Sequence, residues 1–180
     1  MIHLLAFLWG WADATFLPIA PDVLLTLLAL RSLRTALIAA LFATLGTVAG
    51  GAMTYDYANL HPASSREILV SIPGISDRAV GVAGRNIERH GAGAIVLGPP
   101  YKVYAVQWAW QHRPLLPFLL VTIPARGIRY LASSLAAALI AAPLRRRVRE
   151  RTLVTIHLLF WTALYTTTFA SASAAMWPVP

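Results

Sequence analysis

The chain has 180 residues, of which 58% are hydrophobic and only 12% are charged, and its mean hydropathy is +0.64. This composition is typical of a polytopic membrane protein and excludes an ordinary soluble domain. The formal charge of +8 does not indicate a nucleic-acid binder, because the arginines gather at the ends of apolar segments, as the positive-inside rule requires. The absence of cysteine excludes disulfides, thiolate metal sites and cysteine nucleophiles.

The first apolar stretch is interrupted by two acids, Asp13 and Asp22, and two prolines, Pro18 and Pro21. Proline removes a backbone donor and clashes with the preceding turn, so the helix should break here and leave apolar arms of about ten residues. At 1.5 Å per residue each arm covers about 15 Å, half of a hydrocarbon core of about 30 Å. We therefore predict a re-entrant helical hairpin over residues 1–30, with its broken backbone surrounded by protein or beside a watery cavity.

The next apolar stretch predicts a transmembrane helix over residues 35–58. It follows Arg31 and Arg34 and is long enough to span, at about 34 Å. Its small residues include a G-x-x-x-G at Gly46 and Gly50, which allows another helix to approach closely. We favour packing within the chain over dimerisation.

Residues 59–93 are polar and carry charges of both signs, which predicts a loop outside the membrane. Within the loop, Ser76 can begin and Gly91 can end a short helix over residues 77–90. The apolar residues of this segment share one side, so we expect the helix to lie at the membrane interface.

A second broken stretch predicts a re-entrant hairpin over residues 94–113. Pro99 and Pro100 prevent a regular helix at its centre, and Lys102 follows them. Its apolar arms are again too short to span the membrane alone. A full transmembrane helix is predicted directly after it, over residues 115–142.

The last predicted transmembrane helix covers residues 152–177, and a basic cluster precedes it. The positive-inside rule places this cluster in the cytoplasm, and we favour a topological anchor over an anionic-lipid site. The cluster consists of Arg145, Arg146, Arg147, Arg149 and Arg151.

The order of these elements predicts one all-α polytopic membrane domain over residues 1–180. It consists of two inverted repeats, each a re-entrant hairpin plus a transmembrane helix, and one extra C-terminal transmembrane helix. The first hairpin is expected to enter from the cytoplasm and the second from outside. The predicted location is an integral multi-pass membrane protein, in the cytoplasmic membrane if the source is bacterial.

Five ionisable residues lie within apolar sequence, and each would cost about 2.5 to 3.5 kcal/mol at the centre of a lone membrane helix. The acids belong to the first hairpin and the bases to the second repeat, so hairpin tips that meet would bring opposite charges together. Static ion pairs are one interpretation. We favour a substrate or ion site, because broken backbone and ionisable groups coincide twice at matching positions. The five residues are Asp13, Asp22, Lys102, Arg126 and Arg129.

The motifs W-A-D-A-T-F-L-P-I-A-P-D, G-P-P-Y-K-V-Y and F-L-L-V-T-I-P-A-R-G-I-R-Y resemble the DedA (VTT-domain, SNARE-associated) membrane protein family, most closely its small YqaA-like branch. The resemblance covers residues 7–142. Asp13 and Asp22 match the two acids of the family's first motif, and Lys102 matches the basic residue of its second hairpin. Either Arg126 or Arg129 matches the arginine of the following helix.

The resemblance implies two facing re-entrant hairpins and lipid translocation, with polyprenyl-phosphate flipping or phospholipid scrambling as the leading activities and proton coupling in some members. The chemistry fits that implication. A lipid phosphate needs a cationic partner at depth, which Lys102, Arg126 and Arg129 could supply, and arginine suits bidentate phosphate contact. Protonation of Asp13 and Asp22 would release these bases to take the head group.

No enzyme is predicted, because the sequence has no histidine with an aspartate five positions later, no G-x-S-x-G and no P-loop lysine. The histidines share no metal-ligand spacing, so no metal or cofactor is expected. Two alternatives stay open: a proton-coupled transporter of a small solute and a non-transporting membrane assembly factor. The expected partners are lipids with anionic head groups and protons, not nucleic acid, and the oligomeric state is open.

Overall fold

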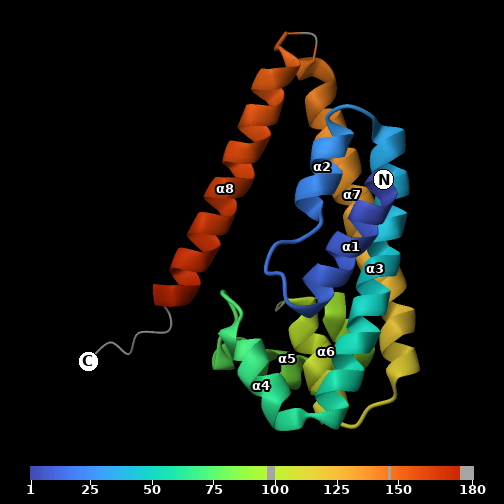
Figure 1. Ribbon diagram of the computed structural model, residues 1–180, viewed down its shortest axis with the longest axis vertical. Helices are drawn as coiled ribbons and strands as arrows, with labels where there is room; N and C mark the ends of the chain where they lie inside the picture. Colours follow the sequence, from blue (N-terminus) through green and yellow to red (C-terminus); the bar gives the residue numbers. More distant parts are fainter. Residues whose placement is uncertain (97–99, 146, 175–180) are drawn as a thin grey trace.

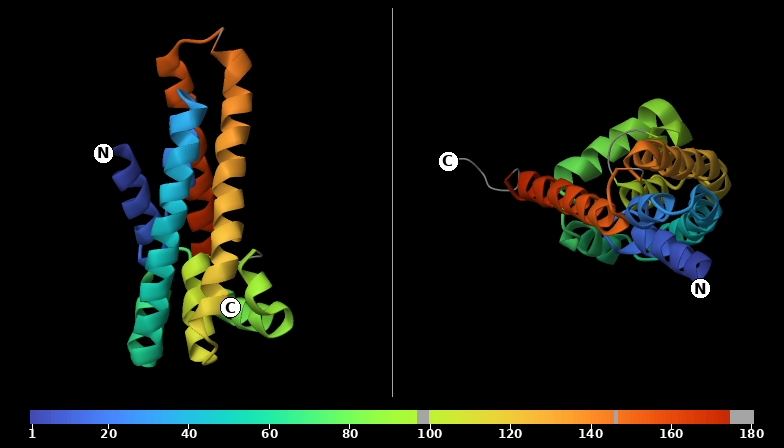
Figure 2. Two further views of the ribbon diagram at one scale, coloured as in Figure 1. Left: turned by 90° about the vertical axis from the view of Figure 1, so that its right-hand side faces the viewer. Right: turned by 90° about the horizontal axis from the view of Figure 1, so that it is seen from above.

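The computed structural model describes residues 1–96, 100–145 and 147–174, with side chains to residue 170, and these ranges contain helices and no strand. Three long helices organise the chain: α3 (Leu33–Leu60), α7 (Leu115–Leu144) and α8 (Glu150–Ala174). α3 and α7 run antiparallel side by side, whereas α8 leaves the end of α7 and diverges from the other helices (Figures 1 and 2).

Each of these three helices is long and apolar enough to cross a membrane. Large hydrophobic side chains stay exposed on all three, such as Leu45 on α3, Ile128 on α7 and Phe160 on α8. Soluble proteins rarely expose apolar surface so extensively, so length, composition and exposure are all compatible with a membrane protein. The bounds of α3 and α7 agree with the two predicted spans to within two residues at each end.

The first apolar stretch forms two short antiparallel helices, α1 (Ile2–Thr15) and α2 (Asp22–Ala29). Residues 16–21 between them are not helical, and Pro18 and Pro21 lie in this break, as predicted. α1 packs along α3 from Ala43 to Thr54, and α2 packs against both α3 and α7, so the break lies near the middle of the long helices (Figure 1). The break is therefore held at the depth of the helix bundle rather than at its end.

Glycines allow α1 to lie directly on α3. Gly46 and Gly50 of α3 face the backbone of Phe7 and Trp11 in α1, and Gly10 of α1 faces the backbone of α3. A Cβ atom at any of the three glycines would overlap that backbone. The G-x-x-x-G of α3 therefore packs within the chain, which confirms the predicted intramolecular role.

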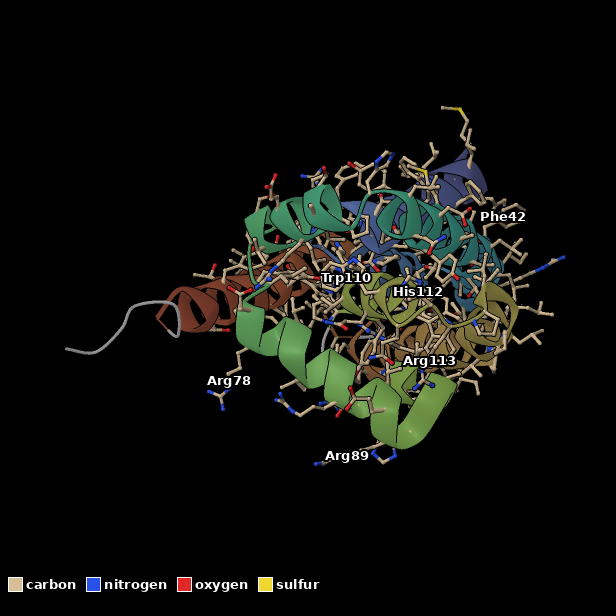
Figure 3. The ribbon with its side chains drawn as sticks, turned by 90° about the horizontal axis from the view of Figure 1, so that it is seen from below. Phe42, Arg78, Arg89, Trp110, His112 and Arg113 are labelled. Atoms are coloured by element: carbon tan, nitrogen blue, oxygen red, sulfur yellow. The ribbon has the colours of Figure 1, made fainter. Side chains whose placement is uncertain are left out.

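The polar segment contains the predicted helix as α5 (Asp77–His90). Its N-terminus is capped by Ser76, whose hydroxyl accepts a hydrogen bond from a backbone N–H three residues later. Gly91 ends it with φ = +55°, a conformation that favours glycine. The charged side chains Arg78 and Arg89 project away from the molecule (Figure 3).

A second helix in this segment, α4 (Pro62–Ser71), was not predicted. Pro62 is compatible with the start of this helix, because proline has no clash in the first turn, where its missing N–H would be unpaired anyway. Pro62 therefore starts α4 instead of interrupting it. α4 and α5 both lie at the end of the molecule opposite the α2–α3 connection (Figure 1).

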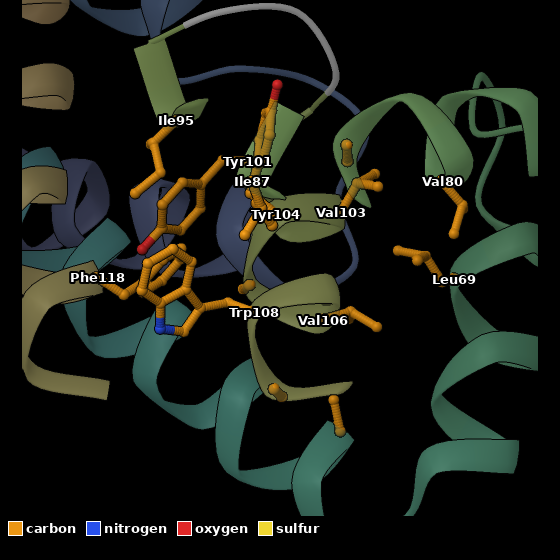
Figure 4. Close-up of a cluster of buried hydrophobic side chains, with 14 of the residues drawn as sticks. Leu69, Val80, Ile87, Ile95, Tyr101, Val103, Tyr104, Val106, Trp108 and Phe118 are labelled. Atoms are coloured by element: carbon orange, nitrogen blue, oxygen red, sulfur yellow. The ribbon is translucent and has the colours of Figure 1, made fainter. Parts of the chain in front are cut away.

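The second broken stretch consists of a 3₁₀ helix, η1 (Gly91–Val96), and α6 (Tyr101–Trp110). It begins three residues before the predicted start at residue 94, and its first arm is only this short 3₁₀ helix. Pro100 is the N-cap of α6, and Pro99 lies outside the described residues. α6 is buried among α3, α5 and α7, where Tyr101 and Trp108 pack around Phe118 (Figure 4).

Basic residues lie at both ends of the long helices. Arg31 and Arg34 lie beside the α2–α3 connection, and Arg145 lies at the end of α7. These connections occupy the same end of the molecule, opposite α4 and α5 (Figure 1). The opposite end carries Arg66 on α4 and Arg78, Arg85 and Arg89 on α5, so the predicted orientation in the membrane stays a prediction.

Candidate functional site

The break between α1 and α2 leaves backbone polar groups without helical partners. In a dry interior each such group must find another partner. Side chains from three different helices provide them: the carbonyl of Leu17 accepts from Lys102 (2.6 Å), that of Ile19 accepts from Trp9 (3.0 Å), and the N–H of Ala20 donates to Tyr165 (2.7 Å). Hydrogen bonds from side chains of α6, α1 and α8 therefore stabilise the backbone of the break.

Lys102 connects the two broken stretches. It is the second residue of α6, where the positive end of the helix dipole disfavours a cation, and it is only 2% exposed. Its ammonium group donates to the carbonyl of Leu17 and interacts electrostatically with Asp13. Both partners belong to the first broken stretch, so the start of α6 is held against the end of α1.

Asp13 lies in the last turn of α1, where the helix dipole disfavours an anion. The carboxylate interacts most strongly with the charge of Arg126 and next with those of Lys102 and Arg129. Among the described residues, however, none forms an ion pair with Asp13. The acid is thus surrounded by bases without being committed to one of them.

Arg126 is more deeply buried than Arg129, the other cation of the site on α7. It is 6% exposed, and its guanidinium carbon lies 4.7 Å from the centre of the Tyr101 ring, in a cation–π contact. Its buried Nε has no hydrogen-bond partner. A buried donor without a partner costs about 1–3 kcal/mol, and more when the group is charged. Arg126 is therefore a buried cation with unused hydrogen-bonding capacity.

Asp22 and Arg129 form a separate pair. Asp22 is the first residue of α2, where the dipole favours an anion, and its side chain is 4% exposed. It accepts a hydrogen bond of 2.9 Å from Arg129, whose side chain is 51% exposed. This pair links α2 to α7 and is a fixed ion pair of the kind that the first interpretation of the charges predicted. Asp13, Lys102 and Arg126 form no such ion pair with one another.

Two buried tyrosines complete the site, and the sequence analysis missed both. The hydroxyl of Tyr101 lies 3.1 Å from that of Thr122, and the hydroxyl of Tyr130 lies 3.1 Å from that of Thr47. Tyr101 also supplies the ring beneath Arg126. In the sequence, Tyr101 directly follows Pro100 and Tyr130 directly follows Arg129. This adjacency to predicted residues is the sequence feature that could have identified them.

The described residues contain no group of three or more His, Asp or Glu side chains that could hold a metal ion. The five predicted residues do come together around the first break, three as a loose cluster and two as a pair. We refer below to Asp13, Lys102 and Arg126 as the charged cluster.

The described fold thus defines an all-helical protein with three helices able to span a membrane. The chain matches no family model, no curated protein and no solved structure. The resemblance to the DedA family therefore rests on the motifs quoted above.

Proposed function

We propose that the protein translocates membrane lipids with anionic head groups, as a flippase or scramblase of polyprenyl phosphate or phospholipid. The observation that carries the proposal is the buried guanidinium of Arg126, whose Nε has no partner. Arginine forms its strongest hydrogen bonds with phosphate and carboxylate groups. A lipid phosphate at this position would satisfy a donor that the protein leaves unsatisfied.

In this proposal both broken stretches are re-entrant hairpins. Its support is their size and position: α1 has 14 residues and α6 has 10, or about 21 Å and 15 Å, too short for a core of about 30 Å. α1 packs on α3 from Ala43 to Thr54, and Tyr101 at the start of α6 packs on Gly51, so both broken stretches meet the middle of α3. Two hairpins entering from opposite sides form an inverted repeat of the kind that places a substrate site at mid-membrane.

The charged cluster then works by exchange of partners. In the resting state Asp13 balances the charges of Arg126 and Lys102 without a fixed ion pair. Protonation of Asp13 removes that negative charge and leaves two cations to receive a phosphate. When the phosphate leaves, deprotonation of Asp13 restores the balance. This sequence couples lipid movement to a proton.

The surface beside the first break favours a lipid over a small polar solute. A cavity of about 220 Å³ lies there, between the end of α1 and helices α3, α4 and α6. Its walls are mainly apolar, with Phe16, Met53, Ile68 and Val106 among them. Such walls suit an acyl or prenyl chain, whereas a polar solute would need hydrogen-bonding groups.

The test is translocation of fluorescent phospholipid and polyprenyl-phosphate probes in proteoliposomes across a pH series. We expect Arg126→Gln to slow translocation at least tenfold and Arg89→Gln, on the exposed side of α5, to leave it unchanged. Asp13→Asn should abolish the pH dependence. If folded Arg126→Gln and Lys102→Ala proteins retain the wild-type rate, the charged cluster is not the site. If wild type moves neither lipid, the proposal fails in favour of a small-solute transporter or an assembly factor.

A further inference from the structure

Two adjoining cavities lie away from the charged cluster, where α2, α7 and α8 meet. A cavity of about 610 Å³ lies at the end of these helices, and Arg31, Arg145 and Glu150 line it. A second cavity, of about 420 Å³, continues from it between α7 and α8. Leu30 and Leu153 line both cavities, so the two adjoin.

The first cavity is basic. Arg31 forms an ion pair through Nε with Glu150 (2.5 Å), and Arg145 donates through Nη2 to the carbonyl of Ala29 (2.6 Å). The second contact caps the carbonyl end of α2, which would otherwise repel an anion. A third cavity, of about 290 Å³, adds Arg151 beside Arg31 and Glu150. The described lining thus has three arginines and one acid, and each guanidinium has donors left over.

The second cavity is apolar. Ile140, Ile156 and Phe160 supply large apolar side chains, and small residues of α7 leave the space between them. The polar side chains of its wall already have partners: Trp161 donates to the hydroxyl of Thr26 (3.1 Å), Nε2 of His157 lies 3.1 Å from the carbonyl of Val23, and Ser133 donates to the carbonyl of Tyr130 (3.1 Å). An acyl chain in this cavity would therefore leave these polar groups satisfied.

We propose that the two cavities together bind one anionic phospholipid, with its phosphate at Arg31 and Arg145 and an acyl chain between α7 and α8. Charge complementarity identifies the occupant. The first cavity is net positive and suits an anionic head group, and the adjoining apolar cavity between α7 and α8, called the slot below, suits a hydrocarbon chain. Basic pockets between transmembrane helices recognise lipids in this way. Both volumes lie within the range of about 300–1,000 Å³ that is typical of ligand pockets.

The bound lipid joins α8 to the rest of the protein. α8 diverges from the bundle and contacts it mainly along α2 (Figures 1 and 2). A lipid in the slot fills the space between α8 and α7. The proposal needs the helices to lie in a membrane but does not need lipid translocation, since the charged cluster does not line these cavities.

The head-group part is tested by native mass spectrometry of the purified full chain titrated with phosphatidylglycerol or phosphatidylcholine of the same acyl chains. Each arginine near a membrane surface contributes about 1 kcal/mol toward an anionic lipid, or about fivefold in affinity. We therefore expect Arg31→Gln to weaken phosphatidylglycerol binding about fivefold and to weaken phosphatidylcholine binding less, because the choline cation offsets the phosphate charge. The control is Arg34→Gln, at the same end of the molecule but outside the lining. Equal effects of the two substitutions would overturn the proposal.

The acyl-chain part has its own control. Ala137→Phe should fill the slot and weaken phosphatidylglycerol binding at least fivefold, whereas Ala132→Phe, exposed on α7 outside the lining, should not. Glycerophosphoglycerol and inorganic phosphate, which carry no chain, should fail to displace the lipid at equal concentration. Displacement by either compound would overturn the lipid assignment in favour of a free phosphate site. Unchanged phosphatidylglycerol binding in Ala137→Phe would show that the acyl chain does not occupy the second cavity. All these measurements record binding, so a failure of lipid translocation would not affect them.

Discussion

The ammonium group of Lys102, at the start of α6, donates a 2.6 Å hydrogen bond to the carbonyl of Leu17, in the break between α1 and α2. The two residues are 85 positions apart. Each occupies a place that local structure makes unfavourable, since one is a cation at a helix N-terminus and the other is a carbonyl outside a helix. Together they satisfy each other, so the two broken stretches stabilise one another.

Lys102 is the only lysine of the chain, which makes this contact directly measurable. Because its side chain is buried and hydrogen-bonded, we expect a water-soluble amine reagent to acetylate it at least tenfold more slowly in the folded protein than in the chain unfolded in strong detergent. Peptide mass spectrometry reads the modification at this residue. Equal labelling rates in the two states would show that the start of α6 is not held against the first break.

Gly51 of α3 leaves room for Tyr101. A Cβ atom at this position would overlap the tyrosine ring and hydroxyl. We therefore expect Gly51→Ala to lower the free energy of unfolding by about 1–3 kcal/mol, the usual cost of overpacking. It should also slow lipid translocation, because Tyr101 supports Arg126.

Gly127→Ala is the matched control, because the nearest atom to its added Cβ would be at 3.8 Å. Replacing glycine by alanine inside a helix with enough space stabilises by roughly 0.5–1 kcal/mol. Thermal unfolding of both variants in the same detergent makes the comparison. If they behave alike, the close contact between Gly51 and Tyr101 has no energetic importance.

The Asp22–Arg129 pair should behave as a structural link. Arg129→Gln leaves a buried carboxylate without its partner, and we expect a loss of about 1–3 kcal/mol in the free energy of unfolding. Asp22→Asn in the same protein removes the buried charge and should recover part of this loss. The four proteins of the double-mutant cycle measure the coupling. Additive effects, with no recovery in the double variant, would contradict a direct interaction.

Tyr165 connects α8 to the first break by accepting the hydrogen bond of the Ala20 N–H. Tyr165→Phe removes the acceptor, so the backbone of residues 16–21 should exchange hydrogen at least several-fold faster. Hydrogen–deuterium exchange with peptide mass spectrometry measures this. Tyr57→Phe, on an exposed position of α3, is the control and should leave exchange in these residues unchanged. A wild-type exchange rate in Tyr165→Phe would mean that α8 does not stabilise the break.

The sequence alone determined the break in the first apolar stretch and the bounds of several helices. Pro18 and Pro21 interrupt the first apolar stretch, and Ser76 and Gly91 bound α5, because a missing N–H, a cap and a positive φ act within a few residues. The length of the apolar runs likewise predicted α3 and α7. The 3₁₀ geometry of η1 was not predicted, because no local sequence signal marks it. The segment instead packs against α5 and α7.

Only the tertiary structure decided which charges are paired. The sequence showed two acids and three bases in apolar surroundings, but it did not distinguish the fixed Asp22–Arg129 pair from the uncommitted Asp13 and Arg126. The roles of Tyr101 and of the α2–α7–α8 cavities were also invisible. These features join residues on different helices, and they depend on which helix faces meet and how closely, which the packing of the whole chain sets.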